Sequence, residues 1–72
     1  MNYKTIATLE KGKQKLRISY SPEKDYFFAI YQSGKKIDDI QTVKQTQLSD
    51  FIKKSIKDGY YGFIQPEYYK PL

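Results

Sequence analysis

The residue types that perform most enzyme chemistry are scarce in this chain. It contains neither His nor Cys, so Ser and Thr lack their usual general base and no thiolate can act as a nucleophile or a metal ligand. The four Gly residues are scattered, whereas a loop that cradles phosphate needs them clustered. We therefore expect no catalytic residues and no cofactor, and we predict that the protein is not an enzyme.

Two adjacent carboxylates, Asp38 and Asp39, are the remaining candidates for metal chemistry. Carboxylate oxygens suit hard cations, but successive residues of a strand point to opposite faces and rarely bind one ion. A bulge would relax that objection and would permit a metal-dependent nuclease. We favour a simpler interpretation, in which the pair marks a bulge or an exposed edge strand whose charge discourages pairing with other chains. No metal site is expected.

Basic residues alternate with apolar ones in the segment 15–20. Leu16, Ile18 and Tyr20 point to one side of a strand, and the residues that point to the other side are Lys15, Arg17 and Ser19. On the next strand we expect Phe28 and Ile30 to join the inward set, which leaves Phe27 and Tyr31 facing outward. The predicted nucleic-acid-binding residues are therefore Lys13, Lys15, Arg17, Phe27 and Tyr31.

A surface that combines cations with exposed rings suits a single strand of DNA or RNA, because the cations contact phosphates while the rings stack on unpaired bases. The chain carries a formal charge of +5 and its pI is near 9.4, which favours a polyanionic partner. All its cations except Arg17 are Lys, so we expect backbone contacts to dominate and sequence preference to be weak. Two alternatives stay open. The Lys residues can simply keep the protein soluble, and the rings can pack against the tail, a second subunit or another protein.

The C-terminal segment predicts a second type of surface, for a protein partner. Tyr is favoured at protein interfaces, and the chain contains eight. The candidate interface residues are Tyr60, Tyr61, Phe63, Tyr68 and Tyr69. Together with an exposed strand edge they would make an accessory or inhibitory module that binds a host protein, as small proteins of phages and mobile elements do. We expect this segment to pack as an extended piece or short strand on its own sheet or on a neighbouring subunit.

The elements that must position these residues predict an α+β fold, an antiparallel meander of three to four strands with one helix packed on one face and an aromatic C-terminal segment. The expected strands are 3–10, 15–20, 26–31 and 37–42. A helical stripe follows, made of Leu48, Phe51, Ile52, Ser55 and Ile56. Thr42 with Gln45, or Thr46 alone, is expected to cap its start, and Gly59 to end it.

Seventy-two residues predict one small domain with a thin core. We divide it into the meander at 1–43, the helix at 44–59 and the aromatic extension at 60–72. A homodimer is possible, since small scaffolds without disulfides often gain stability by association. No apolar run approaches the length of a membrane helix and no signal peptide is recognisable, so we expect a soluble, cytoplasmic protein without a membrane partner.

Overall fold

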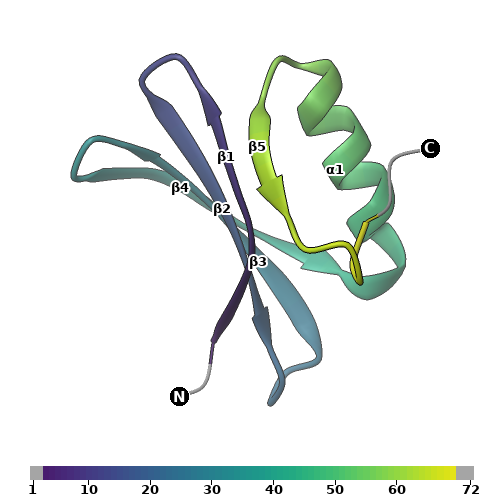
Figure 1. The fold of residues 1–72 in the computed structure, drawn as a ribbon. Coiled ribbons are helices and arrows are strands. Elements are labelled where there is room, and N and C mark those ends of the chain that lie inside the picture. The colour runs from purple at the N-terminus through teal and green to yellow at the C-terminus, as the bar shows by residue number, and fades with distance from the viewer. Residues whose placement is uncertain (1–2, 70–72) are drawn as a thin grey trace.

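A five-stranded antiparallel sheet and one helix form the fold in the computed structural model, which describes residues 3–69 (Figure 1). The strands lie in the order β4-β3-β2-β1-β5. Their bounds are β1 Lys4–Lys11, β2 Gln14–Ser21, β3 Tyr26–Ser33, β4 Lys36–Lys44 and β5 Tyr61–Ile64. The α+β antiparallel meander expected from the sequence is thus confirmed.

The strand count is higher than the three to four expected. Residues 61–64 form β5, which pairs with β1 at the end of the sheet opposite β4. Beyond β5 the chain stays tied to β1, because the amide of Gln65 donates to the carbonyl of Ile6 at 2.9 Å. The sequence predicted an extended piece or a short strand in this segment, and residues 61–64 form such a strand on the sheet of their own chain. Its bounds could not be read from the sequence, because four residues that contain Gly62 have too short an alternating pattern.

The helix α1, Leu48–Lys57, follows a turn of 3-10 helix at Gln45–Gln47. Of the predicted apolar stripe, Leu48, Ile52 and Ser55 are buried and Phe51 is half-buried, whereas Ile56 is exposed. The expected caps are wrong, because Gln47 occupies the N-cap position and its side chain makes no capping hydrogen bond. The expected terminator is confirmed. Gly59 has φ +108°, its amide donates to the carbonyl of Ile56, and the amide of Tyr60 donates to that of Ser55, which is the Schellman arrangement.

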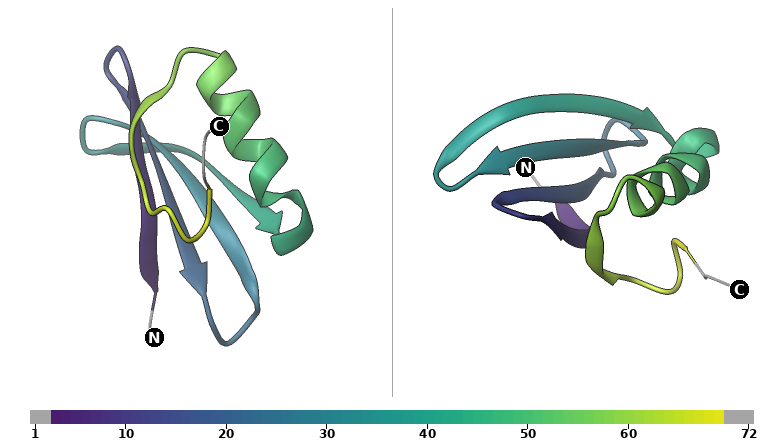
Figure 2. Two further views of the ribbon diagram at one scale, coloured as in Figure 1. Left: turned by 45° about the vertical axis from the view of Figure 1, so that its right-hand side comes forward. Right: turned by 90° about the horizontal axis from the view of Figure 1, so that it is seen from above.

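One side of the sheet carries the core. The helix and the residues after β5 lie on the same side, and no element of residues 3–69 lies over the other side (Figure 2). The buried hydrophobic residues are Ile6, Ala7, Leu9, Leu16, Ile18, Phe27, Ala29, Val43, Leu48, Ile52 and Tyr60. An antiparallel sheet commonly leaves one face to water, but this face exposes large apolar side chains, among them Tyr3, Ile37 and Ile40, which makes it a candidate binding surface.

The adjacent carboxylates lie in a bulge on the edge strand β4, as expected. Tyr31 pairs with Asp39 and Gln32 with Ile37, so Asp38 is the extra residue. Ser33 and Gln14 both donate hydrogen bonds to Asp38, and these bonds hold the pKa of its carboxyl below the ordinary value. Among residues 3–69, no three potential metal-ligating residues are grouped to hold a metal ion.

No helix within residues 3–69 has the length and apolar character needed to cross a membrane.

Candidate binding face

The pairing of β2 with β3 decides which side chains share a face. Leu16 pairs with Tyr31, Ile18 with Ala29 and Tyr20 with Phe27. These pairs lie on the helix side, so the prediction that Leu16, Ile18 and Tyr20 face inward is confirmed. Arg17 pairs with Ile30 and Ser19 with Phe28, which places them on the uncovered side together with Lys15.

The face assigned to the rings of β3 was therefore wrong. Phe28 and Ile30 were expected inside, and Phe27 and Tyr31 outside, but the structure has the reverse. Phe27 is 1% exposed, and its ring packs between Tyr20 at 5.0 Å and Tyr68 at 5.8 Å between centroids. Tyr31 is half-buried against Tyr60. The predicted set of Lys13, Lys15, Arg17, Phe27 and Tyr31 does not form one surface.

The length of the β2–β3 loop explains this reversal. Ser21 pairs with Tyr26 across four loop residues, so even-numbered residues of β2 share a face with odd-numbered residues of β3. A loop with one residue fewer or more would have produced the expected arrangement. The turn is fixed by Asp25, whose φ is +57° and whose amide donates to the carbonyl of Ser21. Since segment 26–31 is apolar on both sides, its own pattern carries no information about its facing.

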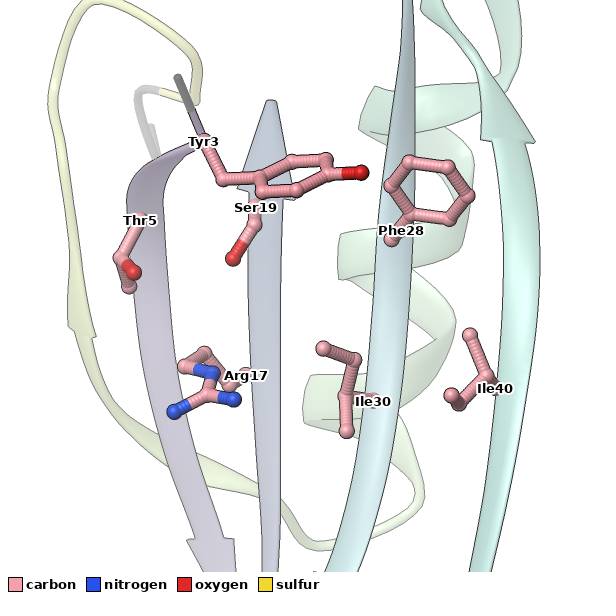
Figure 3. Close-up of a pocket in the computed structure, with 7 residues that line it drawn as sticks. All are labelled: Tyr3, Thr5, Arg17, Ser19, Phe28, Ile30 and Ile40. Atoms are coloured by element: carbon pink, nitrogen blue, oxygen red, sulfur yellow. The ribbon is translucent and has the colours of Figure 1, made fainter. Parts of the chain in front are cut away.

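We call the uncovered side of the sheet the open face. A hollow of about 370 Å³ lies on it, lined by Tyr3, Thr5, Arg17, Ser19, Phe28, Ile30 and Ile40 (Figure 3). These residues come from β1 to β4 and from the residue just before β1, so the sheet curves around the hollow. The ring of Tyr3 meets that of Phe28 edge to face at 5.8 Å, and Tyr26 meets Phe28 at 5.5 Å. We call this the aromatic hollow.

A second hollow of about 470 Å³ adjoins the first along β2 and β3. We call it the polar hollow, and its lining residues are Thr5, Thr8, Lys15, Arg17, Ile30, Gln32 and Gly34. Thr5, Arg17 and Ile30 line both hollows. The open face thus changes from aromatic to polar and basic along the strands, and Arg17 stands where the two parts meet.

The charges on this face are mainly positive. Within residues 3–69 the ion pairs are Lys4 with Glu67 at 3.1 Å and Lys15 with Glu10 at 3.8 Å, and Arg17 takes part in neither. No carboxylate among these residues lines either hollow. Lys13 is exposed in the β1–β2 turn and lines neither hollow.

The aromatic residues of the C-terminal segment divide between the two sides. Tyr60 is buried and donates a hydrogen bond to Gln14, and Tyr68 and Tyr69 pack against the core. Tyr61 and Phe63 are 71% and 63% exposed. They pair with Glu10 and Thr8 of β1, which places them at the margin of the open face. Tyr60, Tyr61 and Tyr69 nevertheless line one groove beside Ile56 of α1, so three of the five predicted interface residues share a surface and Phe63 lies apart from them.

Sequence reasoning missed Tyr3, Phe28 and Ile40 as residues of the site. Tyr3 lies two residues before Thr5, so alternation along the strand could have placed both side chains on the same face. No pattern in the sequence could have placed Phe28, because its strand is apolar on both sides.

The chain matches no known protein family, no curated protein and no solved structure.

Proposed function

We propose that the protein is a small non-enzymatic binding protein whose open face takes up a single strand of DNA or RNA. Arg17 and Lys15 supply positive charge, and Tyr3 and Phe28 supply rings for stacking. This retains the type of ligand expected from the sequence and replaces Phe27 and Tyr31 with other rings.

One observation carries the proposal. Arg17, which has no carboxylate partner among residues 3–69, lines the same hollow as two aromatic rings, on a sheet face that no element of those residues covers. Apolar side chains gathered on an exposed face indicate an interaction surface, and a solvated guanidinium group can bind an anion there. An unpaired base stacks on such rings with about 1–3 kcal/mol per base, and its phosphates take the cations. A base inside a duplex cannot enter the aromatic hollow, so a single strand fits better than a double helix.

A protein partner is the second candidate. Ile37 and Ile40 of β4 are 53% and 54% exposed, and aliphatic side chains contribute little to stacking on bases. With Tyr61 and Phe63 on the far margin, they give the open face an apolar character that suits an interface with another protein.

Titration of labelled oligonucleotides tests the proposal. Single-stranded and duplex forms of one sequence are compared at two salt concentrations, with light scattering to measure the mass of the protein. The test variant reverses two charges on the open face, Lys15→Glu with Arg17→Glu. The control variant reverses two exposed charges on α1, Lys53→Glu with Lys57→Glu, so both variants have the same net charge.

We expect the single strand to bind more tightly than the duplex, with affinity that falls steeply as salt rises. The open-face variant should lose binding and the helix variant should retain most of it. If the two variants lost affinity equally, the loss would be explained by their lower net charge alone, and the proposal for the open face would be overturned. The absence of binding to any oligonucleotide at low salt would leave the protein partner as the better candidate.

A further inference from the structure

We propose that Arg17 makes the open face selective for guanine. This inference rests on the proposed function and names the base that the aromatic hollow accepts. It departs from the weak sequence preference expected from a Lys-rich chain. The reason is that the single Arg lines the hollow in which a base would stack on aromatic rings.

The position of Arg17 distinguishes it from the other cations of the chain. It is the only Arg, and its side chain lines the aromatic hollow together with Tyr3 and Phe28 (Figure 3). Arg17 pairs with Ile30, two residues along β3 from Phe28, so a base stacked on these rings would present its edge towards the guanidinium. Lys15 lines only the polar hollow, beside Thr8 and Gln32, where a phosphate of the same strand would lie. Arg17 is therefore not required as the phosphate contact.

The hydrogen-bonding groups of the aromatic hollow favour a base edge that accepts. The Arg17 guanidinium only donates, and its planar fork can donate two parallel bonds. No carboxylate of residues 3–69 lines the hollow, and the other polar side-chain groups there are the hydroxyls of Tyr3, Thr5 and Ser19. An amino group on a base would thus face a donor-only cation and find no charged acceptor.

Guanine fits these groups best. It presents two neighbouring acceptors, O6 and N7, which match the fork of an Arg. Adenine and cytosine place an amino donor at the corresponding position, while thymine and uracil offer only one acceptor there. A good bidentate pair contributes about 1–3 kcal/mol of discrimination, which corresponds to roughly 5- to 150-fold in affinity.

The test uses fluorescently labelled oligothymidylates that differ at one central position, which carries guanine, adenine, cytosine or 7-deazaguanine. A single guanine keeps the strands free of guanine quadruplexes. The 7-deaza base keeps the rings and O6 but replaces N7 with a carbon, so it removes one acceptor without changing the stacking area. Each strand is titrated with the wild-type protein and with Arg17→Lys, which retains the charge and loses the fork.

For the wild type we expect guanine to bind roughly fivefold or more tightly than adenine or cytosine, and 7-deazaguanine to lose most of that advantage. Arg17→Lys should bind all four strands with similar affinity. Equal affinities for the wild type would overturn the guanine preference and leave the proposed function intact. A preference that survives in Arg17→Lys would overturn the role of Arg17. Failure of every strand to bind would overturn the inference together with the proposed function.

Discussion

Gly62 of β5 lies so close to β1 that a Cβ atom added to it would stand 2.2 Å from the carbonyl oxygen of Thr8. The neighbouring atom is backbone and cannot move aside without breaking the pairing of the two strands. We expect Gly62→Ala to lower the free energy of unfolding by about 2–3 kcal/mol, and to weaken the pairing of residues 61–64 first. Thermal unfolding followed by circular dichroism measures the loss.

Gly34→Ala is the matched control for this substitution. Gly34 also has a positive φ, +61°, but a Cβ there would meet nothing within 4 Å. The cost should therefore be that of the backbone conformation alone, about 1 kcal/mol. Equal losses for the two variants would show that the contact between Gly62 and Thr8 is not tight.

Substitution of the neighbouring rings Phe27 and Phe28 tests the register of the sheet. Phe27→Ala removes a ring that is 1% exposed and should lower the free energy of unfolding by about 3–5 kcal/mol, enough to unfold many small domains. Phe27→Leu gives a smaller loss that can be measured by denaturant titration. Phe28→Ala should cost clearly less stability, because its ring is only half-buried on the open face.

The two rings should have opposite effects on ligand binding. Phe28→Ala is expected to weaken binding of a single strand by roughly 5- to 150-fold, as loss of one stacked base does. Folded Phe27→Leu should bind as the wild type does. If Phe27→Leu impaired binding while Phe28→Ala left it unchanged, the facing of β3 would be the one that the sequence predicted.

The stability of the fold should decrease at alkaline pH. Burial raises the pKa of Tyr31 and of Tyr60 above the ordinary value, and nearby ionisable groups raise both further. In the unfolded chain these hydroxyls ionise first, near pH 10, so the folded state binds more protons above that pH and loses stability as pH rises. The melting temperature should be steady between pH 7 and pH 9 and fall between about pH 10 and pH 12.

Replacing single Tyr residues by Phe separates the effect of these Tyr hydroxyls from the titration of Lys side chains, because the Lys residues are the same in the wild type and in every variant. Tyr31→Phe should reduce the slope of melting temperature against pH above pH 10, and so should Tyr60→Phe, although the latter also loses its hydrogen bond to Gln14. Tyr61→Phe is the control, since that ring is 71% exposed and should leave the slope unchanged. The same slope in all three variants would contradict the assignment to the buried hydroxyls.

The parts of the fold with a strict pattern could be predicted from the sequence. Alternation in 15–20 indicated which side chains of β2 face the core. The apolar stripe that begins at Leu48 predicted the helix, and Gly59 predicted where the helix ends. Adjacent charges at Asp38 and Asp39 indicated the bulge on an edge strand. In each case one local rule was sufficient, because the side chains themselves reveal which side is buried.

The candidate site could be predicted only in part, because it depends on relations between strands. Arg17 and Lys15 were placed correctly by their own alternation. The rings beside them depend on the number of residues between Ser21 and Tyr26, which local composition does not fix. The separation of Phe63 from Tyr60, Tyr61 and Tyr69 depends on pairing between β1 and β5, which are distant segments of the chain.

The location of the ligand on the open face can be measured directly through the methyl groups of Ile side chains. The chain labelled with carbon-13 at Ile methyl groups is titrated with a guanine-containing single strand and followed by NMR. Ile30 and Ile40 line the aromatic hollow, whereas Ile56 and Ile64 line a groove between α1 and β5. The open-face assignment predicts that the signals of Ile30 and Ile40 shift while those of Ile56 and Ile64 stay in place. Shifts confined to Ile56 and Ile64 would contradict it.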